Sequence, residues 1–364
     1  MSLRGQLSLF LLLSCLSPSL EADDSTPAIS WQDVSSWGVE GQGWSPRELQ
    51  NRFDRLPAKA EGVVRDAVWN LSRHSSGISF RFNTDSTEIR IRYEVGNSSL
   101  SMTNLPATGK SGVDLYAFQE GNWKWVDVTR PKEVKTEHVI EGLDPGMRSY
   151  LAYLPLFNTT QSIEIGVLSN AAFEQVAPRD EKPLVFYGTS ITHGASASRP
   201  GMTHVSILGR RLDLPVVNLG FSGNGRMEPE VGALVAEIDA AAYIIDCLPN
   251  MTGDLVAERA EPMVRQIREV RPDIPIVLVE DRTFTNAWIF SAKRKRHQEN
   301  RTALIRAFDN LVSSGVKQIY YIEGEDLLGD DTEAATDGSH PSDLGFLRQA
   351  NAFEPILKTA LGLN

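Results

Sequence analysis

Residues 184–192 read Leu-Val-Phe-Tyr-Gly-Thr-Ser-Ile-Thr, an apolar run that ends in Gly-x-Ser. The run from Leu184 to Tyr187 predicts a short buried strand, and the small residues after it predict a tight turn that leads into a helix. Such a turn lifts a serine hydroxyl out of the end of a sheet, where a small molecule can reach it. Ser190 is therefore a candidate nucleophile.

After Pro183 the chain alternates between segments typical of strands and segments typical of helices. We expect strands near 184–188, 216–219, 243–248, 275–280 and 317–322, and helices near 203–212, 229–238, 255–270, 293–314 and 344–361. This alternation predicts a parallel sheet with helices on both faces. In such sheets, functional side chains gather at the carboxyl ends of the strands.

Four more residues fall at that edge of the expected sheet. Gly223 follows the second strand, Asn250 follows the third, and Asp337 and His340 form an Asp-x-x-His pair before the last helix. Taken alone, a Pro-Asn pair is usually a turn, and an Asp-x-x-His pair more often caps or opens a helix. Their shared position with Ser190 indicates that all five residues belong to one site.

These blocks resemble the four sequence blocks of the SGNH, or GDSL-like, hydrolase superfamily. Thr189 stands where the first block usually has Asp, and Asn250 keeps the Asn of the third block. The resemblance implies a three-layer α/β/α, flavodoxin-like domain. It also implies a serine esterase that works through an acyl-serine intermediate, with no metal and no other cofactor.

The resemblance assigns roles to the candidate residues. Ser190 would attack the ester, His340 would act as general base and then general acid, and Asp337 would orient the imidazole. The backbone N–H groups of Ser190 and Gly223 and the side-chain amide of Asn250 would form the oxyanion hole.

The chain before residue 179 has a different pattern. Residues 78–82, 88–93 and 162–167 alternate between apolar and polar side chains, which predicts half-buried antiparallel strands. The density of such strands predicts an all-β, jelly-roll-like sandwich. We expect this domain to span residues 23–178 and the α/β domain to span residues 179–364.

Two segments of this half resemble the N-terminal domain that precedes one SGNH branch. Residues 111–116, Ser-Gly-Val-Asp-Leu-Tyr, look like its Gly-x-Asp-Leu-Tyr signature, and residues 69–75 also fit it. That branch is similar to bacterial carbohydrate esterases, including acetylxylan esterases. The likeness implies that the substrate is an acylated carbohydrate or another small acyl ester. We expect Asp114 to support a turn or an interdomain contact.

Residues 1–22 have the build of an export signal. Arg4 supplies the positive end, and Leu7 to Leu16 form an apolar run that is too short to span a bilayer. We therefore expect a periplasmic or extracellular protein without a transmembrane segment in the mature chain. Cys15 either leaves with the signal or carries a lipid anchor, if Leu-Leu-Ser-Cys at 12–15 acts as a lipobox. Cys247 then remains alone, so no intrachain disulfide can form.

The composition limits the class of partner. The 364 residues are 41% hydrophobic and 23% charged, as in ordinary globular proteins, and the net charge is −11. This charge argues against nucleic acid or an anionic membrane as a partner. His74, His138 and His297 are scattered without ligand spacing, so no zinc site is expected. Nothing in the sequence indicates an oligomeric state.

Two residues near the blocks have competing interpretations. His193 is a rival base to His340, a pocket residue that contacts substrate, or simply an exposed side chain. Arg226 either contacts a sugar or forms an ion pair with Glu228 or Glu280.

The function also has alternatives from other classes. A lipid esterase or thioesterase would expose a larger apolar groove or lid, and no long apolar loop is evident near the blocks. A glycan-binding protein on a hydrolase fold would use aromatic side chains, for which Trp123 and Trp125 are candidates if they do not pack in a core.

Overall fold

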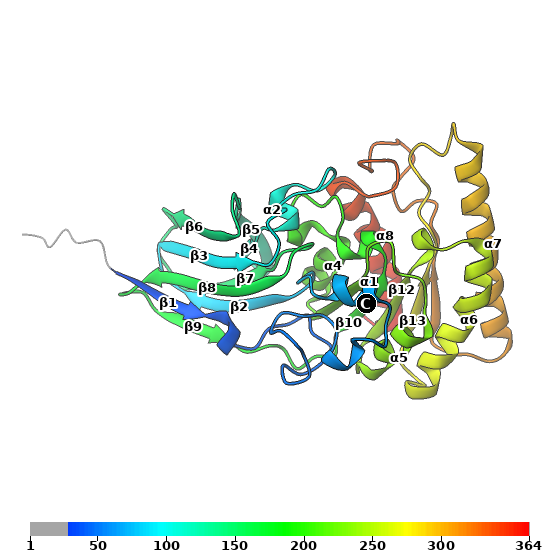
Figure 1. Cartoon of the computed structure of the whole chain (residues 1–364), viewed down its shortest axis with the longest axis horizontal. Coiled ribbons are helices and arrows are strands. Elements are labelled where there is room, and N and C mark those ends of the chain that lie inside the picture. The colour runs from blue at the N-terminus through cyan, green and yellow to red at the C-terminus, as the bar shows by residue number, and fades with distance from the viewer. Residues whose placement is uncertain (1–27, 364) are drawn as a thin grey trace, which may run out of the picture.

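The computed structural model describes residues 28–363, with a strand-rich half beside an α/β half (Figure 1). The predicted export signal and Cys15 lie outside these residues. No helix between residues 28 and 363 combines the length and the apolar character needed to cross a membrane.

Two antiparallel sheets form the first half, in the orders β1-β8-β3-β6 and β5-β4-β7-β2-β9. Their strands are β1 (Ile29–Asp33), β2 (Ser79–Thr84), β3 (Glu88–Val95), β4 (Asp114–Gln119), β5 (Asn122–Val128), β6 (Lys135–Glu141), β7 (Arg148–Tyr153), β8 (Thr160–Leu168) and β9 (Phe173–Val176). Side chains from both sheets, such as Ile91 and Phe82, share one core. The predicted β-sandwich is therefore confirmed, and the alternating pattern of β3 arises because every second side chain points into that core.

Five parallel strands form the sheet of the second half, in the order β11-β10-β12-β13-β14. They are β10 (Leu184–Gly188), β11 (Val216–Gly220), β12 (Ala242–Asp246), β13 (Ile276–Val279) and β14 (Ile319–Ile322). This is the expected α/β fold, and each strand overlaps the segment that the sequence predicts. β12 ends two residues earlier than predicted, because Leu248–Asn250, with Pro249, turns into the 3-10 segment η4.

The helices of this half cover both faces of the sheet. They are α3 (Ser190–His193), α4 (His204–Leu212), α5 (Pro229–Glu237), α6 (Gly253–Val270), α7 (Ser291–Ser313) and α8 (Asp343–Leu361), with the 3-10 segment η3 (Pro200–Met202) before α4. Leu184 and Phe186 of β10 pack with α4 and α8, whereas Val185 and Tyr187 pack on the other face with α5, α6 and α7. Both faces of β10 are thus buried, which explains its unbroken apolar run.

A segment of the first half packs into the core of the second. Between β1 and β2 lie the short helices η1 (Val34–Ser36), η2 (Ala58–Ala60) and α1 (Asp66–Ser72), and α2 (Ala107–Lys110) follows β3. Trp44, Val68 and Trp69 join the same apolar core as Tyr187. In Figure 1, α1 accordingly lies against the α/β half.

Candidate active site

Ser190 stands at the first position of α3, directly after β10. Thr189 caps this helix, because its hydroxyl accepts a hydrogen bond from the N–H of Ile191 at 3.3 Å. Gly188 permits the tight turn, since a Cβ there would lie 2.0 Å from Oγ1 of Thr192 and 2.7 Å from the carbonyl oxygen of Asp246. Ser190 itself is 7% exposed, so the turn presents its hydroxyl at the surface of a well-packed element.

His340 and Asp337 approach Ser190 from the loop before α8. Oγ of Ser190 lies 2.8 Å from Nε2 of His340, and Nδ1 of His340 lies 2.7 Å from Oδ2 of Asp337. The structure thus brings together three side chains that the sequence predicts from two distant segments. Ser190 is within hydrogen-bonding distance of His340, and His340 is within hydrogen-bonding distance of Asp337. With its Nδ1–H donating to the carboxylate, the imidazole presents Nε2 as the acceptor for the serine hydroxyl.

The electrostatics of Asp337 favour its charged form. Burial acts to raise its pKa, but hydrogen bonds from the backbone N–H of His340, from the imidazole and from the backbone N–H of Ser339 outweigh burial and lower the pKa. An ionised Asp337 both orients the ring and stabilises an imidazolium.

The loop after β11 packs on the turn that carries Ser190. The N–H of Phe221 donates to the carbonyl oxygen of Gly188 at 2.9 Å, and a Cβ at Gly225 would lie 2.1 Å from that oxygen. Gly223 is exposed at the tip of the loop with a φ of +70°, a conformation that favours glycine.

Asn250 is held by the same loop. Its Oδ1 accepts a hydrogen bond from the N–H of Gly225 at 3.2 Å. Because this contact occupies the oxygen of the amide, the NH₂ group remains available to donate to a ligand. The structure therefore brings Ser190, the loop of Gly223 and Asn250 together at the carboxyl ends of β10, β11 and β12.

Both halves of the chain are similar to known protein families. Residues 181–358 match the GDSL-like lipase/acylhydrolase family, and residues 29–173 match the N-terminal domain of SGNH-hydrolase-type esterases. The crystal structure of a GDSL-like lipase from Bacteroides ovatus is 31% identical, with a TM-score of 0.88 over 93% of this chain and 99% of that chain. The chain belongs to the GDSL-like, or SGNH, hydrolase family.

More distant structures share the fold of this GDSL-like hydrolase. The salicylyl-acyltransferase SsfX3 from a tetracycline biosynthetic pathway is 20% identical, with a TM-score of 0.70 over 93% of this chain and 96% of that one. An acetyl xylan esterase, Est2A, from the rumen bacterium Butyrivibrio proteoclasticus is 10% identical, with a TM-score of 0.56 over 92% of this chain and 99% of that one. No curated protein matches the chain.

A buried ion pair beside α3, the helix that carries Ser190, was not anticipated from the sequence. Asp246, the last residue of β12, accepts two hydrogen bonds of 2.9 Å from Arg282 and one of 3.2 Å from Oγ1 of Thr192. Both charged side chains are 0% exposed. Burial raises the pKa of Asp246, although Arg282 opposes that rise. The one signal in the sequence is a carboxylate that ends an otherwise apolar strand.

The expectation that His193 contacts substrate is corrected by the structure. His193 is 0% exposed, its Nε2 lies 2.8 Å from the carbonyl oxygen of Leu156, and its ring stacks on Phe157 with a centroid separation of 3.8 Å. Burial, with Arg55 nearby, holds its pKa well below the ordinary value. A neutral ring enclosed in this way packs the interface between the two halves of the hydrolase and is not a rival base.

Arg226 directly follows the loop 222–225, which carries the candidate oxyanion donor Gly223. Its Nε donates to the carbonyl oxygen of Gly223 at 3.1 Å, and its side chain is exposed. The alternative ion pairs do not form, because Glu228 pairs with Arg65 and Glu280 with Arg301. Contact with a sugar remains a prediction for Arg226.

Asp114 of the Gly-x-Asp-Leu-Tyr signature connects the two halves, as predicted. Its buried carboxylate accepts hydrogen bonds from Arg199 at 2.9 Å, from the N–H of Gly201 at 2.8 Å and from Nε1 of Trp125 at 2.9 Å. Trp125 keeps 47% of its surface exposed while Arg199 covers its ring. Its indole therefore contributes to the interdomain contact.

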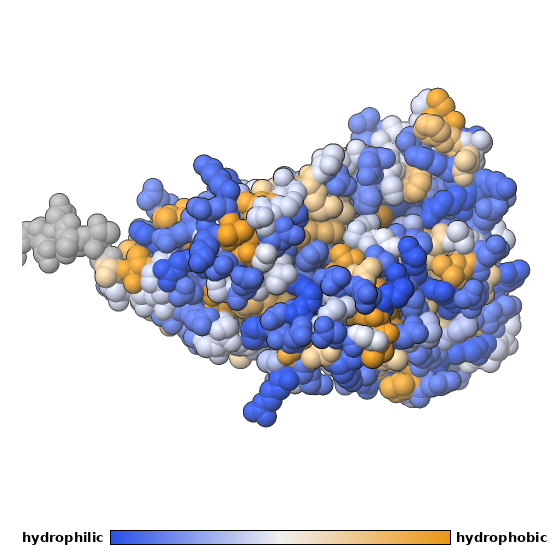
Figure 2. Space-filling view, in the orientation of Figure 1, coloured by the Kyte–Doolittle hydropathy of each residue, from blue (hydrophilic) through white to orange (hydrophobic). Residues whose placement is uncertain are grey.

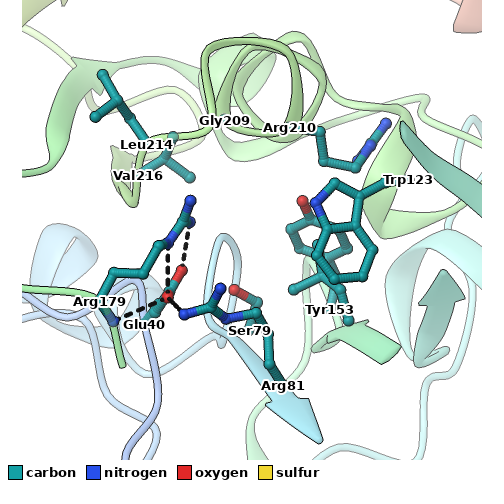
Figure 3. Close-up of a pocket in the computed structure, with 11 residues that line it drawn as sticks. Glu40, Ser79, Arg81, Trp123, Tyr153, Arg179, Gly209, Arg210, Leu214 and Val216 are labelled. Carbon is teal, nitrogen blue, oxygen red and sulfur yellow. Dashed lines mark hydrogen bonds and ion pairs between the residues drawn. The ribbon is translucent and has the colours of Figure 1, made fainter. Parts of the chain in front are cut away.

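A small cavity between the two halves is distinct from this site (Figure 3). Glu40 forms ion pairs there with Arg179 at 2.7 Å and with Arg81 at 3.1 Å, while Trp123 and Tyr153 face them across the cavity. Its volume of 20 Å³ has room for little more than one water molecule. None of the candidate catalytic residues lines it, so the cavity belongs to the interdomain packing.

Proposed function

We propose that this hydrolase is an exported serine esterase that removes short acyl groups, acetyl foremost, from carbohydrates. The observation that carries the esterase chemistry is the series Ser190–His340–Asp337, with contacts of 2.8 and 2.7 Å. Export is supported by the apolar run and flanking residues of the first 22 positions.

In the first half of the reaction, Oγ of Ser190 forms a bond to the carbonyl carbon of the ester while its proton passes to Nε2 of His340. The tetrahedral intermediate then breaks the bond to the alcohol, which leaves with the proton that His340 returns. A water molecule repeats these steps on the acyl-serine, so the products are a carboxylic acid and an alcohol.

The negative charge of the tetrahedral intermediate is matched by three donors. They are the backbone N–H groups of Ser190 and Gly223 and the side-chain NH₂ of Asn250. The contact between Oδ1 of Asn250 and the N–H of Gly225 fixes the orientation of that amide before substrate binds. Donors that are already oriented need no rearrangement when charge develops, which is the main source of their catalytic effect.

A carbohydrate substrate is supported by the likeness to the acetyl xylan esterase and by the matching N-terminal domain. In this proposal, the exposed guanidinium of Arg226, which also donates to the carbonyl oxygen of Gly223, bonds a sugar hydroxyl.

One observation favours a second candidate, an esterase for longer or lipid acyl chains. Trp288, Ile289 and Phe290 are 70%, 60% and 49% exposed in the loop before α7. Figure 2 shows a hydrophobic cluster that projects from the end of the molecule where α7 begins. The N–H of Thr285 in this loop donates to Gly338 at 2.9 Å, so the loop borders the segment that carries His340. This short apolar segment was not predicted from the sequence to border the site.

Initial rates on p-nitrophenyl esters of increasing acyl length separate these functions, with Ser190→Ala measured beside the wild type. The proposal predicts that the rate is highest for acetate, falls with chain length, and is lost in the variant, after which acetylated xylan is the next substrate to test. A preference for long chains would establish the lipid candidate. Wild-type activity that survives in Ser190→Ala would refute the mechanism, and a folded protein inactive on all esters would favour a glycan-binding role.

A further inference from the structure

We propose that Arg65, from the N-terminal half of the chain, is a positioning residue that holds the oxyanion loop of the α/β half. This role rests on the proposed function, because it acts through the loop 222–225 that carries Gly223. In this role, the N-terminal half contributes a residue that positions the active site of the esterase.

Arg65 forms a hydrogen bond with Asn224, the residue between Gly223 and Gly225 in the loop. Its Nη1 donates to Oδ1 of Asn224 at 2.7 Å, across 159 positions of sequence. Asn224 follows Gly223, the proposed oxyanion donor, and precedes Gly225, whose N–H holds the amide of Asn250. A shift of Asn224 would therefore displace two of the three oxyanion donors at once.

The same guanidinium connects the loop to the nucleophile strand. Its Nε donates to Oε1 of Glu228 at 2.8 Å, and Oε2 of Glu228 accepts a hydrogen bond from the hydroxyl of Tyr187 at 3.1 Å. Tyr187 lies in β10, three residues before Ser190. The planar guanidinium of Arg65 thus bonds both ends of the segment 224–228. Through Glu228 it is also connected to β10, the strand that precedes Ser190.

The backbone of Arg65 is itself rigid. Its carbonyl oxygen accepts hydrogen bonds from the N–H groups of Val68 at 2.8 Å and Trp69 at 3.0 Å in α1. Val68 and Trp69 are buried in the core of the α/β half. Arg65 therefore extends from a fixed point, which is what a group needs to hold a loop in place.

A second arginine, Arg55, bonds the end of β11, just before the loop 222–225. Arg55, which is 0% exposed, donates from Nη1 to the carbonyl oxygens of Asn218 at 3.0 Å and Gly220 at 2.8 Å. Arg55 is a poor test residue, because removing a buried cation would destabilise the whole interface. Arg65 has 42% of its side chain exposed, so its substitution can be accommodated.

The chain offers a matched control in Lys59. Like Arg65, Lys59 reaches from the segment between β1 and β2 to the α/β half, where its Nζ lies 2.8 Å from Oε1 of Glu237. Glu237 ends α5 and is not part of the oxyanion loop. Lys59→Ala therefore removes an interdomain ion pair without releasing the loop.

The experiment is to determine kcat and KM on p-nitrophenyl acetate for the wild type, Arg65→Ala, Arg65→Lys, Lys59→Ala and Ser190→Ala. We expect Arg65→Ala to lower kcat roughly 10- to 100-fold with KM changed by less than about twofold, because a loosened loop misplaces donors that act on the transition state. Arg65→Lys keeps the positive charge but loses the planar guanidinium that bonds Asn224 and Glu228 together. Its kcat should therefore lie between that of the wild type and that of Arg65→Ala. Lys59→Ala should retain kcat within about twofold.

A double-mutant cycle with Asn224→Ala shows whether Arg65 acts through that residue. If it does, Arg65→Ala should add little to the loss of kcat in Asn224→Ala, since the contact is already broken. Equal kcat values in Arg65→Ala and Lys59→Ala, or fully additive losses in the cycle, would overturn the inference. Failure of the proposed function looks different, because either Ser190→Ala would keep the wild-type activity or the folded wild type would hydrolyse no ester.

Discussion

Asp337 holds His340 at two points, because one carboxylate oxygen accepts the ring Nδ1–H at 2.7 Å and the other accepts the backbone N–H of His340 at 2.9 Å. The acid and the base therefore form one rigid turn, and Gly338 permits it with a φ of +89°. The orientation of the imidazole relative to Asp337 is therefore set within four residues of sequence.

This turn leads to the first prediction. Asp337→Asn should lower kcat on the order of 10³–10⁴-fold, because an amide at this position favours the wrong imidazole tautomer and does not stabilise the imidazolium. The measurement is kcat and KM on p-nitrophenyl acetate. Asp331→Asn is the control, since Asp331 pairs with Arg348 earlier in the same loop and should leave kcat within about twofold of the wild type. Similar rates in the two variants would show that Asp337 does not orient the base.

The oxygen and the NH₂ group of the Asn250 amide have roles that can be tested separately. The oxygen accepts the hydrogen bond from Gly225, and the NH₂ group is the proposed oxyanion donor. Asn250→Ala should lower kcat on the order of 10²–10³-fold with little change in KM, as expected for one oxyanion donor. Asn250→Asp keeps an acceptor for the N–H of Gly225 but faces the intermediate with negative charge, so it should be slower than the alanine variant. An aspartate variant faster than the alanine variant would show that the amide serves the loop and not the oxyanion.

The ion pair of Asp246 and Arg282 predicts an asymmetric effect on stability. Asp246→Leu should lower the free energy of unfolding by about 3–5 kcal/mol, because it leaves Arg282 charged and unpaired at 0% exposure. The double variant Asp246→Leu with Arg282→Met should be more stable than that single variant, since no buried charge is left. Urea unfolding at pH 7.5 measures both, and a double variant less stable than the single one would contradict this interpretation.

Buried histidines should make the protein sensitive to acid. Burial among Phe186, Phe346 and Phe353, with Arg282 nearby, lowers the pKa of His204 to about 3. Its pKa in the unfolded chain is near 6.5, so the unfolded state binds the extra proton between about pH 6.5 and pH 3. The free energy of unfolding should therefore fall as pH decreases through this window, by about 1.4 kcal/mol per pH unit from His204 alone.

The variant His204→Leu tests this origin. Its unfolding free energy, measured from pH 7.5 to pH 4.5, should depend on pH less steeply by about one proton. His74, with its pKa lowered to about 3 by burial, and His193 remain in the variant and should preserve a reduced slope. An unchanged slope would mean that His204 can be protonated in the folded protein.

Much of the α/β half was predictable because it depends on local pattern and chain order. Apolar runs such as Leu184–Tyr187, bounded by turn residues, are typical of buried strands, and parallel strands place their carboxyl ends at one edge. Ser190, Gly223, Asn250 and the Asp337–His340 turn follow from these two rules, and the structure gathers them at that edge. His193 was misjudged because its distance from Ser190 in sequence says nothing of Leu156 and Phe157, which enclose it from the other half.

The sequence by itself determined which segments become strands and helices, and therefore which side chains lie at the carboxyl ends of the parallel strands. Only the tertiary structure decided that Arg65 meets Asn224, that Arg282 neutralises Asp246 and that Trp69 enters the core of the other half. The reason is physical: periodicity reports the environment of a residue relative to its own element, whereas a hydrogen bond between residues 159 positions apart depends on how whole elements pack.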